Sequence, residues 1–353
     1  MPFCSYNADG PGGPISSLKN NGFVAAQILH AFLSRGYNIR TTIRSPDKAE
    51  ALKKSFSKYT SQLSCVVVGD IVEEGAFDEA VKGVDGVVHS TSPFVFDVKD
   101  YEHDLLIPAI NILKAVQNNA PQVERIIITS SFATIIDMDK GLRPGYTYSE
   151  KDWNPVTYDV AANPETSVEV SYCASKAFAE KAAWDFIKEN KPNFNLSVVC
   201  PPMVYGPNAQ NVTSLDHLNT SSADVYHLIN GSEKTVLNTN FFGFVDVCDM
   251  GEAHARAYES AEAAGQHFII AGGTYTYAQV CEVIRKHFPE LKDKTPDPST
   301  APIENAYNFS NEKARKELGM DFRNLETTIH DQVLEFLNLE KKLVEYFFVN
   351  NDD

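Results

Sequence analysis

Short apolar runs alternate with segments of helical periodicity through the first two thirds of the chain. The runs at 63–68 (LSCVVV) and 125–129 (RIIIT) are rich in Val and Ile, which is typical of strands buried on both faces of a parallel sheet. Between such runs, apolar residues recur at helical spacing, most clearly over 168–189. Strands that alternate with helices in this order predict an α/β fold with a Rossmann-type, doubly wound parallel sheet.

The same pattern predicts elements for most of the chain. Strands are expected at 37–44, 63–68, 86–89, 125–129 and 196–200. Helices are expected at 22–35, 46–54, 76–84, 105–117 and 168–189. The alternation weakens beyond residue 205, where we expect helices at 213–231, 279–288, 310–318 and 326–347 and short strands at 241–247 and 267–271.

These elements divide into three parts. Residues 1–20 are polar, contain the Gly-Pro-rich stretch at 10–14 and show no convincing strand, so they form an atypical N-terminal segment. Residues 21–205 are expected to form the nucleotide-binding Rossmann domain, to which the region 241–250 returns. Most of 206–353 is expected to form a smaller, mixed substrate-binding part over the strand ends.

Composition narrows the possible functions. The chain has 353 residues and a net charge of −16, which argues against a nucleic-acid or anionic-membrane surface. No run of eighteen apolar residues predicts a membrane span, and the N-terminus does not resemble a secretory signal. The six cysteines are scattered singly without Cys/His ligand spacing, so we expect reduced thiols, a cytoplasmic location and no metal site.

Tyr172 and Lys176 stand four residues apart in the helix expected at 168–189. They would therefore project from one face of that helix, about one turn apart. A phenol has a reference pKa of about 10, and a neighbouring ammonium favours the phenolate and lowers that value. The pair is a plausible device for proton transfer. The alternative is a tyrosine that packs near a solvated lysine.

Polar residues follow each expected strand of the sheet. Because ligands of an open parallel sheet bind beyond the carboxyl ends of its strands, these residues are expected at one edge. The series is Arg44, Ser45 and Lys48, then Asp70 and Ile71, then Ser90, Thr91 and Ser92, then Ser130 and Ser131, and finally Pro201 and Pro202. A whole series that converges on one edge indicates a binding site there.

Together these segments resemble the extended short-chain dehydrogenase/reductases. The resemblance is narrower to the fungal NADPH-dependent carbonyl and methylglyoxal reductases, which are related to the plant dihydroflavonol reductases. It covers about residues 21 to 340. The matching motifs are NGFVA at 21–25, RSPDKAE at 44–50, HSTSPF at 89–94, DLLIPA at 104–109, TSS at 129–131, WNP at 153–155, YCASK at 172–176 and FVDV at 244–247.

The resemblance implies roles for four residues in the reduction of a carbonyl group. Tyr172 would donate a proton to the carbonyl oxygen as hydride reaches the carbon, and Lys176 would lower the pKa of Tyr172 and bind the nicotinamide ribose. Ser131 would hydrogen-bond the same oxygen; its alternative is a serine that satisfies backbone groups at a strand end. Asn111 would support a water-linked proton relay; its alternative is an ordinary asparagine on a helix face.

The residue after the second expected strand bears on the choice of cofactor. An NAD site usually has an acid there that accepts from the ribose 2′-hydroxyl, whereas this chain has Arg44. A guanidinium suits a 2′-phosphate, so NADPH is favoured over NADH; the alternative is a solvated arginine. Asp70 would accept from the adenine amine, and Ile71 would pack on the ring.

The resemblance also implies two larger sets of contacts. The expected cofactor contacts are Gly22, Phe23, Val24, Arg44, Lys48, Asp70, Ile71, Thr91, Ser92, Ser130, Tyr172, Lys176, Pro201 and Val204. The candidate substrate contacts around the nicotinamide are Phe94, Phe132, Val204 and Tyr205. The alternative for these substrate contacts is ordinary core packing, and an apolar, aromatic-lined pocket would suit small or medium carbonyl compounds.

The N-terminal segment departs from the family pattern. When the sequence is aligned on Asn21-Gly22-Phe23, Lys19 stands where the first glycine of the nucleotide loop is expected, and the preceding residues lack an apolar strand. That glycine normally permits a tight turn against the pyrophosphate. Cofactor binding is the step that this departure would weaken.

The sequence therefore predicts an NADPH-dependent reductase of aldehydes, ketones and 1,2-dicarbonyls, working as a monomer or homodimer on a small-molecule substrate. Two alternatives stay open. One is a non-catalytic or cofactor-impaired relative, because the first strand and first glycine are missing. The other is a sugar-nucleotide epimerase or dehydratase of the same superfamily, although the motifs at 92–94 and 153–155 match reductases better.

Overall fold

A computed structural model describes residues 15–18, 22–90, 107–163, 165–209, 212, 214–302 and 305–350. Its centre is a seven-stranded sheet in the order β10-β7-β5-β4-β1-β2-β3, and every neighbouring pair is parallel. The strands are β1 (Ile15–Leu18), β2 (Ile39–Ile43), β3 (Leu63–Val67), β4 (Gly86–His89), β5 (Arg125–Thr129), β7 (Asn195–Cys200) and β10 (Gln266–Ile269). Strand order 3-2-1-4-5 is the doubly wound arrangement, so the predicted fold class is confirmed.

The prediction that the first strand is missing was wrong. Residues 15–18 form β1 in the middle of the sheet, where Ile15 aligns with Ile39 of β2 on one side and with Gly86 of β4 on the other. The sequence ISSL lacks the apolar run of a buried strand, which is why the pattern did not indicate it. Backbone pairing with two neighbours decides the conformation here, because strand propensity depends strongly on context.

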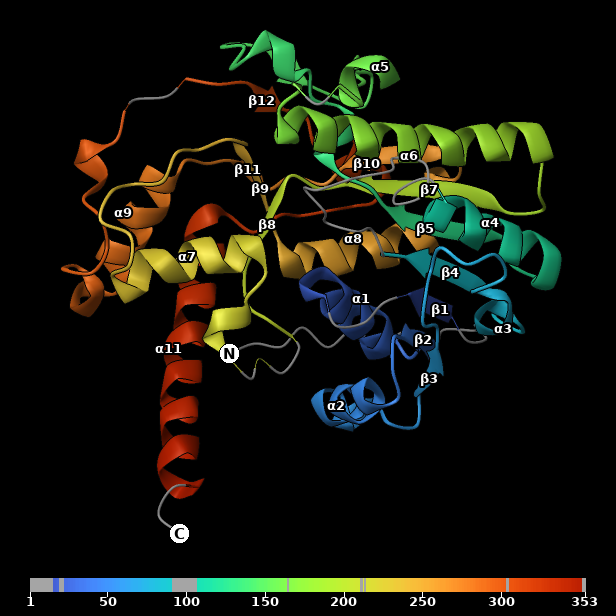
Figure 1. Cartoon of the computed structure of the whole chain (residues 1–353), viewed down its shortest axis with the longest axis horizontal. Helices are drawn as coiled ribbons and strands as arrows, with labels where there is room; N and C mark the ends of the chain where they lie inside the picture. Colours follow the sequence, from blue (N-terminus) through green and yellow to red (C-terminus); the bar gives the residue numbers. More distant parts are fainter. Residues whose placement is uncertain are drawn as a thin grey trace.

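Helices cover both faces of the sheet (Figure 1). One face carries α1 (Phe23–Ser34) and α8 (Val247–Glu259), and the other carries α3 (Asp78–Val81), α4 (Ile107–Asn119) and α6 (Val168–Asn190). Gly251 of α8 lies so close to α1 that a Cβ there would be 2.5 Å from the Gln27 carbonyl oxygen. This close approach needs a glycine.

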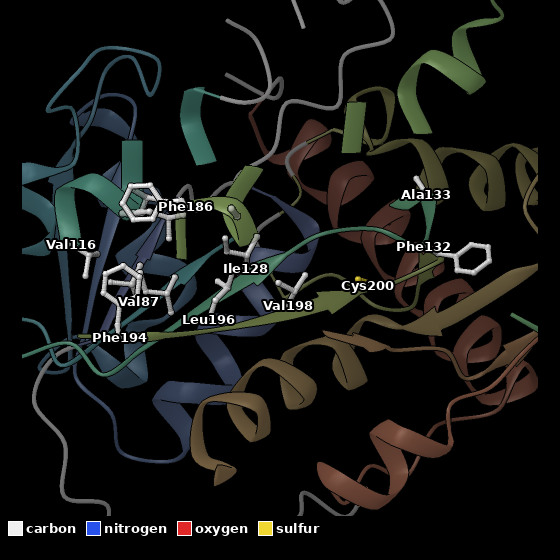
Figure 2. Close-up of a cluster of buried hydrophobic side chains, with 14 of the residues drawn as sticks. Val87, Val116, Ile128, Phe132, Ala133, Phe186, Phe194, Leu196, Val198 and Cys200 are labelled. Carbon is white, nitrogen blue, oxygen red and sulfur yellow. The ribbon is translucent and has the colours of Figure 1, made fainter. Parts of the chain in front are cut away.

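Successive residues of the central strands alternate between two hydrophobic clusters. Val87, Ile128 and Leu196 face the cluster under α4 and α6, whereas their neighbours Val88 and Ile127 face the cluster under α1 and α8. Figure 2 shows the first of these clusters, in which Phe186 of α6 and Val116 of α4 lie over the strand side chains. The period of two is the expected geometry of a strand, and it explains the continuous apolar runs.

The C-terminal part is smaller and mixed, as expected. A three-stranded sheet joins β8 (Met203–Tyr205), β9 (Gly243–Asp246) and β11 (Gly273–Thr274), and a two-stranded sheet joins β6 (Thr147–Tyr148) and β12 (Asn308–Phe309). The chain returns to the large sheet at α8, which begins inside the region 241–250, and again at β10 beyond that region. The remaining helices are α2 (Asp47–Ser55), α5 (Tyr158–Ala161), α7 (Thr220–Asn230), α9 (Tyr277–His287), α10 (Glu312–Glu317) and α11 (Leu325–Asn350).

Helix α6 is the element that carries the candidate chemistry, and it matches its predicted range of 168–189 closely. Ser167 caps its N-terminus by accepting a hydrogen bond from the Val170 amide, and Lys191 ends it in a left-handed conformation with φ 46°.

None of the helices in the described ranges combines the length and hydropathy needed to span a membrane.

Candidate active site

The candidate site begins where β5 ends. Ser130 and Phe132 continue the pairing with the neighbouring chain, since their amides donate to the carbonyls of Val199 and Pro201 at 2.8 Å each. Ser131 lies between them in an extended conformation, φ −156° and ψ 153°, and its hydroxyl oxygen accepts from the Ala133 amide at 3.1 Å. Ser131 is thus held at the carboxyl edge of the sheet, as the series of strand-end residues predicted.

Tyr172 of α6 reaches the same point. A side-chain hydrogen bond joins it to Ser131, and its ring packs against the cluster under α4 and α6. Lys176 follows one turn later, only 7% exposed, with its Nζ 5.4 Å from the centre of the Tyr172 ring. That distance is within the range of a cation–π contact. The structure therefore brings Ser131, Tyr172 and Lys176 together from two elements.

The pKa of Tyr172 differs from the expectation. Burial raises the pKa of this phenol above its ordinary value, and the hydrogen bond with Ser131 lowers it by less. The expected lowering by Lys176 is therefore not the dominant effect here, because removing the phenolate from water costs more than the neighbouring groups restore. A raised pKa keeps the hydroxyl protonated at neutral pH, which is the form that a proton donor requires.

Asn111 of α4 holds the loop that follows β3. Its Nδ2 donates to the carbonyl oxygens of Ile71, Val72 and Glu73 at 3.2, 2.9 and 3.1 Å, and the residue is 8% exposed. These contacts give the side chain a structural role. The proton relay proposed for Asn111 stays a prediction.

The N-terminus of α1 could hold a phosphate group. Gly22 is the N-cap residue, and as a glycine it has no side chain to bond the first helical amides. Among the described residues, a Cβ built on Gly22 would meet only the Cβ of Ala25, at 3.9 Å, so this part of the chain leaves room near the helix end. Unbonded amides and the helix dipole favour an anion at such an end. Phe23 is buried and Val24 packs against the core, so only their backbone suits the predicted contact.

Two cations lie beyond the end of β2. Arg44 is exposed and makes no hydrogen bond or ion pair with another residue in the described ranges. Lys48 is exposed too, with its Nζ 3.9 Å from a carboxylate oxygen of Asp47. A fork of guanidinium donors in this position fits a phosphate on the adenosine ribose.

The end of β3 is arranged as expected in outline. Asp70 is exposed, and its Oδ1 accepts from the Val72 amide at 3.0 Å, which fixes the turn. Ile71 is half-buried against the core. The predicted contact of Asp70 with an adenine amine stays a prediction.

Two candidate substrate contacts are core residues. Phe132 is 2% exposed and packs edge-on against Phe309 and Tyr148. Tyr205 is fully buried, and its hydroxyl lies 2.7 Å from that of Tyr275. Large rings beside a site and rings inside the core look alike in a sequence. The burial of these two rings favours the alternative of core packing, and their contact with substrate stays a prediction. Val204, half-buried, packs beside α1 and α8.

The remaining predicted residues divide into two groups. Pro201 is buried after β7, and the Ser130 hydroxyl donates to the Glu180 carboxylate at 2.6 Å. The other predictions lie outside the described residues, namely Lys19, Thr91, Ser92 and Phe94.

Sequence reasoning missed Glu180. It is buried on α6 and bonds Ser130 directly beside the site. A signal was present, because Tyr172, Lys176 and Glu180 follow one another at intervals of four and so share one helix face. Its partner His267 comes from β10, and no sequence spacing indicates that pairing.

The sequence and the fold match a known family. The model of the NAD dependent epimerase/dehydratase family matches residues 20–271, and this chain belongs to that family. The chain is 36% identical over 338 residues to the NADPH-dependent methylglyoxal reductase GRE2 of Saccharomyces cerevisiae, covering 92% of this chain and 98% of that one. It is 40% identical over 329 residues to the ketoreductase azaE of Aspergillus niger, covering 90% and 95%.

A solved structure gives the same comparison in three dimensions. The yeast methylglyoxal/isovaleraldehyde reductase Gre2, complexed with NADPH, superposes with a TM-score of 0.83 at 35% identity, over 93% of this chain and 99% of that one. The vestitone reductase of alfalfa superposes with a TM-score of 0.73 at 20% identity, which shows the shared fold alone.

Proposed function

We propose that this chain is an NADPH-dependent reductase that converts aldehydes, ketones and 1,2-dicarbonyls of the methylglyoxal type to alcohols. The observation that carries the proposal is the joining of Ser131 to Tyr172 by a hydrogen bond, with buried Lys176 stacked on the same ring. The relatives named as a methylglyoxal reductase and a ketoreductase cover nine tenths of the chain and support it.

The residues at the nucleotide end fit NADPH. The open N-terminus of α1 at Gly22 would hold the pyrophosphate, and Arg44 would bind the 2′-phosphate. When bound, NADPH supplies the hydride that reduces the carbonyl carbon. The structure neighbour in complex with NADPH supports this choice of cofactor.

The protein's own part is to orient the carbonyl oxygen and to protonate it. Ser131 and Tyr172 present two hydroxyls at one point, so both can donate to the same oxygen. Negative charge develops on that oxygen in the transition state, and one pre-aimed donor in a dry site is worth about 3 kcal/mol. Tyr172 then gives up its proton. Lys176 stabilises the phenolate that forms, because its charge lies one turn away on the same face.

The two alternatives have less support. A UDP-glucose 4-epimerase superposes at 16% identity, which shows the fold alone, whereas the relatives named as reductases share more than twice that identity. The non-catalytic reading rested on a missing first strand, and β1 removes that reason. Its other reason, Lys19, lies outside the described residues.

Location and assembly are part of the proposal. The described cysteines, Cys65, Cys173, Cys200, Cys248 and Cys281, are all free thiols. Free, mostly buried thiols suit a reducing compartment, so we place the enzyme in the cytoplasm as a monomer or homodimer.

The proposal is tested by titrating the purified protein with NADPH by fluorescence and then following NADPH oxidation with methylglyoxal and with a branched aldehyde. Saturable binding with turnover of at least one of these substrates is expected. Saturable binding without turnover over a broad carbonyl panel would contradict the reductase function. Absence of NADPH binding would favour the non-catalytic alternative.

A further inference from the structure

A buried polar cluster lies beneath the site, and the Glu180 carboxylate is its centre. Glu180 is 3% exposed in the middle of α6. One oxygen, Oε1, accepts from Nδ1 of His267 at 2.9 Å and from the indole N–H of Trp184 at 3.2 Å. The other, Oε2, accepts from Ser130 Oγ at 2.6 Å and lies 3.6 Å from Cys200 Sγ. Four donors from different residues therefore surround this carboxylate.

The surroundings of His267 favour the protonated, positively charged form of its ring. Its two nitrogens face acceptors, the Glu180 carboxylate at Nδ1 and the Glu150 carbonyl oxygen at Nε2, 2.7 Å away. Two acceptors require two N–H groups, which only the imidazolium has. Burial lowers the pKa of His267, but the hydrogen bond and charge of Glu180 outweigh it and the pKa is raised. For Glu180 the signs are reversed. Burial raises the pKa of its carboxyl group, and the hydrogen bonds from His267 and Ser130 bring that pKa below its usual value.

Three side chains of this cluster, Glu180, Cys200 and His267, are of residue types that bind zinc. The ligand atoms of Glu180, Cys200 and His267 lie within 4.8 Å of one another. A metal, however, needs a lone pair on a ring nitrogen, and both nitrogens of His267 are engaged as N–H donors. The geometry is therefore that of a hydrogen-bonded ion pair.

This ion pair reaches the site through one residue. Thr129, Ser130 and Ser131 are consecutive at the end of β5, and each side chain has a different partner. Thr129 Oγ1 lies 2.7 Å from Nε2 of His254 on α8, Ser130 bonds Glu180, and Ser131 bonds Tyr172. Ser130 and Ser131 therefore both contact α6, so the bond from Ser130 to Glu180 ties this stretch of backbone to the helix that carries Tyr172.

We propose that Glu180, paired with the His267 imidazolium, is a positioning residue that aims the Ser131 hydroxyl at Tyr172 by holding Ser130. This inference rests on the proposed reductase function, since Ser131 matters only if it contacts the carbonyl oxygen. The inference adds two residues to that function. Glu180 is a buried charge that does not contact substrate, and His267 comes from β10 at the edge of the sheet.

Two matched variants test the inference. Ser130→Ala and Trp184→Phe each remove one hydrogen bond to the same carboxylate, but only Ser130→Ala cuts the connection to Ser131. We expect kcat at saturating NADPH to fall roughly tenfold or more in Ser130→Ala, because small misplacements of a reacting group are costly. Trp184→Phe should stay within about twofold of the wild-type kcat. Equal kcat values in the two variants would overturn the positioning role.

The charge state of His267 can be measured directly, without an activity assay. In wild-type protein labelled with ¹⁵N, the ring nitrogens of His267 should both remain protonated as the pH passes 6.5, the usual pKa of histidine. In Glu180→Gln the ring should lose a proton at a lower pH, because burial and the charge of Lys313 lower the pKa of His267 and the carboxylate that opposed them is gone. A wild-type His267 that is neutral at pH 6.5 would overturn the inference.

These outcomes separate the inference from the function on which it rests. A wild-type chain that binds NADPH but turns over no carbonyl compound contradicts the proposed function. A wild-type chain that turns over, with Ser130→Ala at the same kcat, contradicts the positioning role alone.

Discussion

The two ends of the candidate site are built in opposite ways. At the proton-transfer end, Ser131, Tyr172 and Lys176 are bonded or stacked against one another, and a buried ion pair lies beneath them. At the nucleotide end, Gly22 and Arg44 are exposed at the ends of their elements and bonded to few protein groups. The first end is ordered by the protein, and the second offers its donors to a ligand.

This difference predicts how mutations act. A change at the proton-transfer end alters buried contacts, so it should affect catalysis and often stability as well. A change at the nucleotide end alters exposed charges, which contribute little to folding. It should affect cofactor affinity while leaving the free energy of unfolding almost unchanged.

The largest effect is expected from Tyr172→Phe, which removes the proposed proton donor. Turnover should fall by roughly 10²–10⁴-fold, while the NADPH dissociation constant stays within a few-fold. Tyr205→Phe is the matched control, because it removes a tyrosine hydroxyl from the core of the C-terminal part. That control should lower Tm and leave kcat near the wild-type value. Both variants are measured by steady-state kinetics, and a Tyr172→Phe enzyme that is still active would remove this tyrosine from the mechanism.

Ser131→Ala should have the next largest effect. Loss of one donor to the developing negative charge is expected to lower kcat by about 10²–10³-fold with little change in cofactor binding. Ser175→Ala provides the comparison, since that hydroxyl donates to the Tyr172 carbonyl oxygen within the helix. If both serine variants lose the same small fraction of kcat, Ser131 does not contact the reacting oxygen.

Arg44→Asp tests the nucleotide end. Loss of a charge-assisted bond to the 2′-phosphate should weaken NADPH binding roughly 10–100-fold and NADH binding far less. Lys53→Asp on α2 makes the same change in net charge away from the strand ends. Equal losses of affinity for the two cofactors in fluorescence titrations would contradict the proposed contact.

The smallest effect concerns stability and pH. The pKa of His267 is raised, so the stabilisation from its charged form is complete below pH 6.5 and is lost as the pH rises through the folded-state value. The pKa of Glu180 is lowered, so its contribution is complete above pH 4.5 and is lost as the pH falls through the folded-state value. We expect Glu180→Gln to flatten the decline of Tm above pH 6.5. If plots of Tm against pH are parallel for the wild type and Glu180→Gln, the Glu180–His267 pair does not titrate in this way.

The sequence was most informative about local order. Intervals of four placed Tyr172 and Lys176 on one helix, and continuous Val/Ile runs identified the buried strands. Strand β1 was missed because ISSL owes its conformation to the neighbours on both sides. Tertiary pairing of this kind leaves no period in the sequence.

Burial was the second property that the sequence did not reveal. Phe132 and Tyr205 are core residues, and the pKa of Tyr172 is raised where a lowered value was expected. Both outcomes depend on how much water reaches a side chain, which is set by elements distant in the chain. The pairing of Glu180 with His267 depends on β10 joining the sheet beside β7, and it too has no local signature.

The central claim is that this chain reduces a carbonyl carbon by hydride transfer while Tyr172 supplies the proton. The most direct measurement is mass spectrometry of the alcohol formed from methylglyoxal with NADPH deuterated at its transferable position. The account predicts deuterium on the former carbonyl carbon and an equal amount of oxidised cofactor. An alcohol without deuterium, or saturable NADPH binding with no alcohol, would contradict it.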